Sequence, residues 1–272
     1  MPAKRKPRAM KPTSPRAARR LAQKAAKSGL PTLADLGQRL AQAKLKGTSG
    51  ALETRAKRIL TSYLQTAQSY GMPAKEVIAE MASGQAAWRL GSAVRDEILK
   101  TPPDAVRNAA CKQGCAFCCI LKGGEGGLIS EVEAQRLHTA LAPLQGAPDG
   151  REWHENACPA LDPNTQECRA YDARPMICRS FLSTDSEACR LNAQGETEQG
   201  AGLLGSHLDY LALQALCRQV LKGITQVHTY SMAATAAAAV EGADQAASLT
   251  KARHKPSALD TACRDAAHAA GA

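Results

Sequence analysis

The sequence predicts a mainly α-helical protein in which helical segments flank a loop-rich, cysteine-rich domain. Two observations support this fold class. Apolar residues recur at helical spacing before and after the middle of the chain, and eight of the ten cysteines fall between those two segments. We therefore expect five regions: a basic, disordered tail and linker at 1–50, a helical segment at 51–103, a cysteine-cluster domain at 104–200, a helical segment at 201–250 and a weakly ordered C-terminus at 251–272.

The helical segments are recognised by their periodicity and their end signals. One helix is expected from Ala51 to Tyr70 and a second from Pro73 to about Lys100. Within the cysteine-cluster domain, the spacing of Ser130 and Glu133 is that of a capping box and predicts the start of a short helix. Residues 203–224 and the alanine-rich residues 233–250 predict the last helices.

The positive charge is concentrated at one end of the chain. The formal net charge is +10, from 35 basic and 25 acidic residues, and residues 1–27 hold ten Lys and Arg and no acid. The rest therefore carries 35 − 10 = 25 basic and 25 acidic residues, a net charge of zero. Such a tail buries too little apolar surface to fold. It is either a solubilising tail or a weak, non-specific binder of nucleic-acid phosphates.

The expected cellular setting bears on the state of the cysteines. No segment approaches the roughly 20 apolar residues of a membrane span, which argues against a membrane protein. The charged N-terminus has no apolar core after it, so it does not resemble a secretory signal and a cytoplasmic location is expected. Because the cytosol keeps thiols reduced, metal ligation is a better interpretation of the cysteines than disulfides.

Eight cysteines form the candidate metal site. The segment around them has too few apolar residues to fold on its own core, and thiolates are soft ligands suited to zinc or to iron–sulfur clusters. The candidate cofactors are therefore zinc, iron or a [4Fe–4S] cluster. The predicted ligands are Cys111, Cys115, Cys118, Cys119, Cys158, Cys168, Cys178 and Cys189.

The sequence leaves the number of sites open. Cys118 and Cys119 are adjacent, so they serve different metals or only one of them is a ligand. Eight thiolates satisfy two four-sulfur sites, and four satisfy one site with spare thiols. His154, four residues before Cys158, is a possible substitute ligand. Cys217 is expected to be a core residue. Cys263 receives no role.

The neighbours of these cysteines form a more specific pattern. Cys-x-x-Cys-Cys at 115–119 is followed by Cys158-Pro-x-Leu, Tyr171-x-x-Arg-Pro and Cys178-Arg-x-Phe. This pattern, over about 104–185, resembles the YkgJ-type cysteine-cluster family, a zinc- or iron-chelating domain. The resemblance implies a metal-binding domain without an assigned biological role. Flagellin lysine N-methylases carry a similar cluster, which implies an iron–sulfur-dependent enzyme of redox or methyl transfer as an alternative.

Three residues beside the cysteines are predicted to support the metal site. Thiolates on zinc or on a cluster leave a net negative charge, which Arg174 and Arg179 can neutralise while donating hydrogen bonds to sulfur. Tyr171 is expected to pack into the small core of the domain. No catalytic set is visible elsewhere, and His207 and Asp209 are expected on the polar side of a helix. The sequence does not identify a protein partner.

Overall fold

A computed structural model describes residues 29–121, 125–196, 198, 201–203 and 205–269. The basic tail at 1–27, with its expected disorder and its candidate binding to phosphates, lies outside the described residues. The expectation of a mainly α-helical protein is confirmed, since helices account for most of the described chain and the strands have only three residues each.

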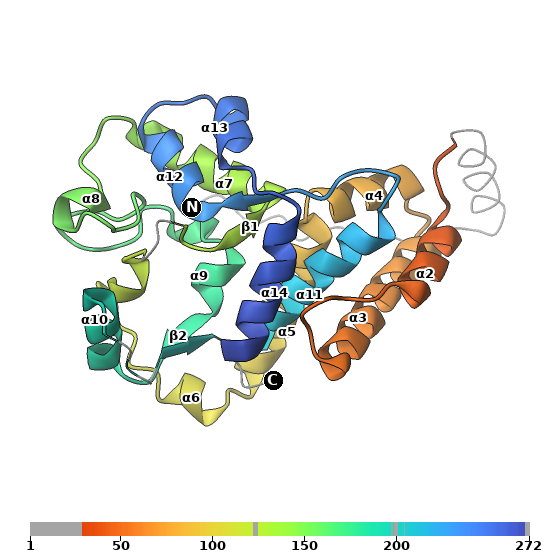
Figure 1. The fold of residues 1–272 in the computed structure, drawn as a ribbon, viewed down its shortest axis with the longest axis horizontal. Helices are drawn as coiled ribbons and strands as arrows, with labels where there is room; N and C mark the ends of the chain where they lie inside the picture. Colours follow the sequence, from red (N-terminus) through yellow and green to blue (C-terminus); the bar gives the residue numbers. More distant parts are fainter. Residues whose placement is uncertain (1–28, 122–124, 197, 199–200, 204, 270–272) are drawn as a thin grey trace, which may run out of the picture.

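Long helices from both ends of the chain form one side of the molecule (Figure 1). They are α2 (Leu33–Gln42), α3 (Gly50–Ser69), α4 (Ala74–Ala82), α5 (Gln85–Lys100), α11 (Gly205–Val220) and α14 (Ser257–Ala269). Helix α11 is central, because it packs against each of the other five. Their buried side chains form a continuous apolar cluster, the helical core, in which Leu60, Leu213 and Leu216 are fully buried.

Helix α2 was not expected, because residues 1–50 were assigned to a tail and linker. Thr32 and Asp35 form a capping box at its start, and Leu36 and Leu40 bury one face. Arg39 secures the helix by donating hydrogen bonds of 2.9 Å to the carbonyls of Val220 and Lys222. The ordered region therefore begins well before Ala51.

A glycine separates the two helices that follow α3. Gly84 has a φ of +81°, in the left-handed region that favours glycine, and a Cβ at this position would collide with the Ser130 side chain. The helical conformation is therefore interrupted between α4 and α5, where the sequence predicted one helix from Pro73 to about Lys100.

The C-terminal part of the chain also differs from expectation. Residues 251–272 were expected to be weakly ordered, but α14 buries Leu259, Cys263 and Ala266 in the helical core. Spacings of four and three residues place these small and apolar side chains on one helical face. Cys263 is therefore a core residue, like Cys217.

Burial on α11 corrects a second expectation. His207 and Asp209 are only 4% and 0% exposed, because the helix is surrounded by its neighbours. Arg55 on α3 donates two hydrogen bonds of 2.7 Å to the Asp209 carboxylate. Burial raises the pKa of Asp209 and Arg55 opposes that rise.

A second apolar cluster lies on the other side of the molecule. Its regular elements are β1 (Leu128–Ser130), α7 (Glu131–Leu141), η2 (Ala142–Leu144), β4 (Thr229–Ser231), α12 (Met232–Val240) and α13 (Gln245–Ala252). Strands β1 and β4 pair antiparallel, with Leu128 opposite Ser231. The predicted capping box of Ser130 and Glu133 starts α7 and is confirmed.

The buried Glu133 carboxylate joins the two clusters. Oε2 accepts hydrogen bonds from the Ser130 hydroxyl at 2.7 Å and from the Tyr210 hydroxyl on α11 at 2.5 Å. Oε1 accepts one from the Met176 backbone N–H at 2.7 Å. Because Met176 begins the helix that carries Cys178, this carboxylate fixes a cysteine-bearing helix against both cores.

The cysteine-rich segment contains short elements connected by loops. They are α6 (Asp104–Arg107), η1 (Phe117–Cys119), α8 (Gly150–Trp153), η3 (Tyr171–Ala173), α9 (Met176–Ser180), β2 (Phe181–Ser183), α10 (Ser186–Gln194) and β3 (Ala201–Leu203). Strands β2 and β3 pair antiparallel, with Phe181 opposite Leu203. None of the helices in the described parts of the chain combines the length and the apolar content required to span a bilayer.

Candidate metal centre

All eight predicted ligands line one cavity of about 180 Å³. They come from two stretches that are distant in sequence, 111–119 and 158–189, and the fold brings those stretches together. All ten cysteines lie among the described residues and none of them forms a disulfide. The remaining lining is apolar apart from the side chains of Lys112 and Arg174.

Tight turns place the first four cysteines. Gly114, with a φ of +77°, allows the turn in which the Cys115 backbone N–H donates to the Lys112 carbonyl at 3.1 Å. The 3-10 helix η1 then presents Cys118 and Cys119 in succession. Short spacers between the four cysteines therefore bring all of them to the same cavity.

Backbone pairing brings Cys158 and Cys168 to the same place. The Cys158 N–H donates to the Cys119 carbonyl at 2.8 Å, and Ile120 forms an isolated β-bridge with Ala157. A second bridge pairs Leu161 with Cys168. The loop of Cys158 is therefore bound on one side to η1 and on the other to the loop of Cys168.

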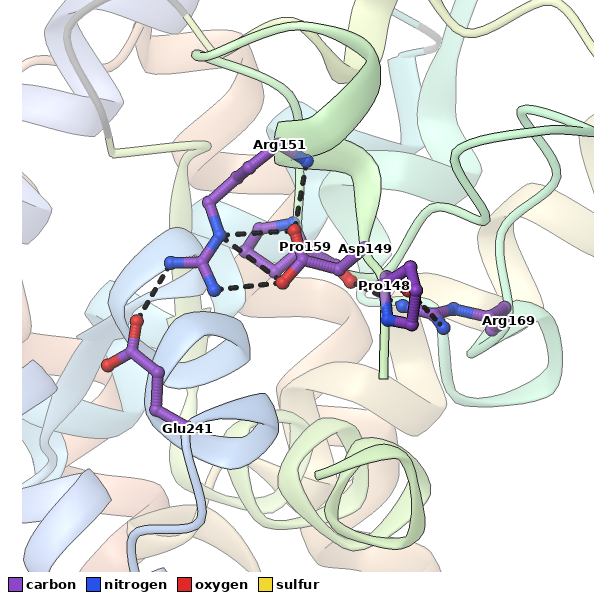
Figure 2. Close-up of polar contacts among 6 residues, drawn as sticks. All are labelled: Pro148, Asp149, Arg151, Pro159, Arg169 and Glu241. Atoms are coloured by element: carbon purple, nitrogen blue, oxygen red, sulfur yellow. Dashed lines mark hydrogen bonds and ion pairs between the residues drawn. The ribbon is translucent and has the colours of Figure 1, made fainter. Parts of the chain in front are cut away.

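Arg169 braces the loop of Cys158 from outside (Figure 2). Its guanidinium donates to the Pro148 carbonyl at 2.9 Å and to the Pro159 carbonyl at 3.1 Å. A proline has no backbone N–H, so these carbonyls are the polar groups that the two prolines offer. The cysteine pattern gave no signal for this role, although Arg169 directly follows Cys168.

Next to this brace, Arg151 ties the start of α8 to α12 (Figure 2). It binds the Asp149 carboxylate at 2.8 Å and the Glu241 carboxylate at 2.8 Å. Burial opposes ionisation of Asp149, but the hydrogen bonds from Arg151 outweigh it and lower its pKa. The wall of the cavity that holds Cys158 is thus attached to the second apolar cluster.

The predicted arginines have different partners. Arg174 lines the cavity and hydrogen-bonds Cys168. Burial lowers the pKa of Arg174, but this hydrogen bond and the nearby thiols raise it overall. Arg179 instead donates to the carbonyls of Arg174 and Asp172, at 2.8 and 2.7 Å. It therefore positions the segment that carries Arg174.

Tyr171 does not pack into a core, as the sequence analysis expected. Its side chain is 62% exposed, and the Arg174 guanidinium lies 4.2 Å from the centre of its ring. A cation over an aromatic face is attracted by the ring electrons. Tyr171 thus covers Arg174 from the solvent side.

The thiols of the cavity influence each other electrostatically. Burial raises the pKa of Cys158 to about 11, and the negative charge of Cys168 adds to the rise. Burial also raises the pKa of Cys178, again reinforced by Cys158 and Cys168. A bound cation removes the cost of placing several thiolates together, so this part of the cavity favours a metal over free thiolates.

The pair on η1 behaves differently. The Cys119 thiol donates a hydrogen bond to Cys118 and, with the charge of Arg174, lowers the pKa of Cys118 to about 7. The same interaction raises the pKa of Cys119. Of the two, Cys118 is the thiol that loses its proton more readily, so it is a candidate for the first thiolate to meet an incoming metal.

Side-chain rotation is needed before the cysteines can hold an ion. In the described part of the chain, no three Cys, His, Asp or Glu side chains are arranged to hold a metal as they stand. The eight cysteines surround the space that a metal would occupy, so ligation requires their thiols to turn into it. The donor set fits zinc and iron–sulfur centres, whose preferred ligands are thiolates.

Three further residues show which side chains reach the cavity and which do not. Met232, on α12 and far from the cysteine motifs, lines it with its thioether 3.3 Å from the Cys178 sulfur. The buried Cys217 lies in the helical core, as expected. His154 is not one of the cavity-lining residues, and its Nδ1 accepts a hydrogen bond from the Asn156 backbone.

Comparison with known families agrees with this geometry. Residues 110–200, about a third of the chain, match the family CxxCxxCC, described as "Putative zinc- or iron-chelating domain". The match covers this segment and not the rest of the chain. The matched residues include all eight cavity cysteines, whereas Cys217 and Met232 lie outside them. No curated protein and no solved structure matches the chain.

Proposed function

We propose that the protein binds zinc, or an iron–sulfur cluster, through the thiolates of its CxxCxxCC domain, with zinc as the favoured ion. The observation that carries the proposal is the convergence of eight cysteines on one cavity. Soft sulfur ligands select zinc, copper(I) and iron–sulfur clusters over magnesium or calcium. The zinc- or iron-chelating description of the family supports the same class of metals.

The lining supports a structural or metal-carrying role over acid–base catalysis. Among the described residues, the charged groups on the cavity wall are Lys112 and Arg174, and the wall has no carboxylate or imidazole. Both cations favour the negative charge that several thiolates retain around a divalent ion. In this role, the metal would add to the stabilisation that the second apolar cluster gives the segment.

Metal content and colour test the proposal. Protein purified without oxygen should contain stoichiometric zinc and be colourless. Stoichiometric iron with acid-labile sulfide and visible absorbance would instead favour an iron–sulfur protein, and with it the enzyme class. Protein that binds neither metal after reconstitution would contradict the proposal.

A matched pair of variants tests the ligands. Cys178→Ser should lose metal, because Cys178 lines the cavity, whereas Cys217→Ser should keep it, because Cys217 lies in the helical core. Wild-type metal content in Cys178→Ser would remove that residue from the ligand set.

A further inference from the structure

The adjacent cysteines of η1 face two sides of the cavity. A 3-10 helix has about three residues per turn, so successive side chains leave it about 120° apart. Cys118 is exposed, whereas Cys119 is partly buried and packs against the second apolar cluster. The two thiols are neighbours in sequence and line the same cavity, yet they belong to different surroundings.

Four cysteines share the buried side. Cys158 is a member of the second apolar cluster, and three others pack against it. We call these four the inner set: Cys119, Cys158, Cys168 and Cys178. The Cys158 N–H donates to the Cys119 carbonyl at 2.8 Å, and Arg174, which lines the same cavity, interacts electrostatically with Cys119, Cys168 and Cys178. Backbone and cation therefore both link members of this set.

The other four cysteines lie outside both apolar clusters of the described chain. We call them the outer set: Cys111, Cys115, Cys118 and Cys189. The Ser183 carbonyl accepts a 2.8 Å hydrogen bond from the Ala110 N–H and lies 3.8 Å from the Cys111 sulfur. Helix α10, which begins three residues later and carries Cys189, packs against η1.

Each set has its own cation at the cavity wall. Arg174 lines the cavity and interacts electrostatically with three members of the inner set. Lys112 lies between Cys111 and Cys115 of the outer set in sequence and also lines the cavity. Four thiolates around a divalent metal leave residual negative charge, which one nearby cation partly offsets. Each set of four sulfurs therefore has one positively charged side chain beside it.

We propose that the cavity holds two metal centres, one on the inner set and one on the outer set, which meet at Cys118 and Cys119. This inference rests on the proposed metal-binding function and adds the number of centres and the ligands of each. The inner centre is enclosed by the second apolar cluster. The outer centre opens to solvent through Cys111 and Cys118, both exposed, and should exchange its metal faster.

Counting centres in variants of each set tests the proposal. Wild-type protein should hold two equivalents of zinc, or two clusters counted by iron and acid-labile sulfide. Cys111→Ser and Cys168→Ser should each hold one, under a chelator concentration at which the wild-type protein keeps both. The equivalent left in Cys168→Ser should be released to the chelator faster than the one left in Cys111→Ser.

Three outcomes are distinguishable. A wild-type protein with one equivalent, or a Cys111→Ser variant that loses both or neither, would overturn the two-centre proposal and leave the metal-binding function standing. Absence of any bound metal would overturn the proposed function itself. Cys111 is exposed, so this variant should fold, and it decides the question even if Cys168→Ser does not fold.

Discussion

The two sides of the molecule use cysteine in different ways. In the helical core, Cys217 is fully buried and burial raises its pKa to about 12, so it is a neutral core residue. Around the cavity, eight cysteines face one another and a cation, and the pKa of Cys118 is lowered to about 7. The helical core is closed by helix packing alone, whereas the cysteine-rich side has short elements and a sulfur-lined cavity. The role of a cysteine in this protein is therefore indicated by its surroundings and not by the residue type alone.

Metal removal should produce the largest difference in stability between the two sides of the molecule. Thiolate-held structural zinc contributes on the order of 10 kcal/mol to folding. With excess chelator, amide hydrogens of residues 110–194 should exchange rapidly, while those of α3, α5 and α11 stay protected. Hydrogen exchange read by mass spectrometry measures both regions in one sample. Equal protection of residues 110–194 with and without chelator would show that this side does not depend on a metal.

The helical core should be most sensitive at the ion pair between the half-exposed Arg55 and the buried Asp209. Arg55→Ala leaves the Asp209 carboxylate, whose side chain is 1% exposed, without its partner. An uncompensated buried charge costs about 3–5 kcal/mol. Urea denaturation should show this loss, with bound metal unchanged before unfolding. Arg58→Ala on the exposed face of the same helix is the control and should change stability little. A similar loss in both variants would mean that the pair is not the cause.

Local signals in the sequence predicted much of this arrangement. The capping box of Ser130 and Glu133 starts α7, the helix begun near Ala51 is α3, and Cys217 is in a core. The eight cysteines of the motif line one cavity. In each case residues close in sequence carry the information, through hydrogen bonds at a helix end, apolar periodicity or motif spacing. Whether all eight cysteines bind metal stays a prediction.

Long-range packing explains what the sequence did not predict. Helix α14 buries a face made partly of small residues such as Cys263 and Ala266, and its burial depends on α11. His207 and Asp209 looked like the polar side of a helix because nothing local shows that α11 is surrounded. Met232 reaches the cavity from α12, outside the cysteine motifs, only because the strands before α7 and α12 pair.

Acid should destabilise the helical core through His207. Burial lowers the pKa of this imidazole to about 4, and its Nδ1 has no hydrogen-bond partner. An unfolded histidine titrates near pH 6.5, so stability is complete above that pH and falls as the pH drops towards 4. The loss should reach about 2 kcal/mol at pH 5 and about 3 kcal/mol near pH 4.

A comparison of variants isolates this effect from metal release. Between pH 7 and pH 5, the urea midpoint of metal-depleted wild-type protein should fall more than that of His207→Phe, whose ring can stack on Tyr210 as the imidazole does. If both proteins lost stability equally over this range, another group would be responsible.

The smallest expected difference in stability is between alanine substitutions at two glycines that have similar positive φ values. Gly126, at the cavity, and Gly223, after α11, have φ values of +64° and +80°, so alanine at either position costs about 1–2 kcal/mol of backbone strain. Only at Gly126 would the added Cβ also meet other atoms, 2.6 Å from Met232 Cε and 2.9 Å from Leu121 Cδ1. Thermal unfolding should therefore show a somewhat larger loss for Gly126→Ala. Chelator competition should show weaker metal binding in Gly126→Ala alone, because this contact displaces the cavity wall. Unchanged metal affinity in Gly126→Ala would mean that the thioether side of the cavity does not shape the metal site.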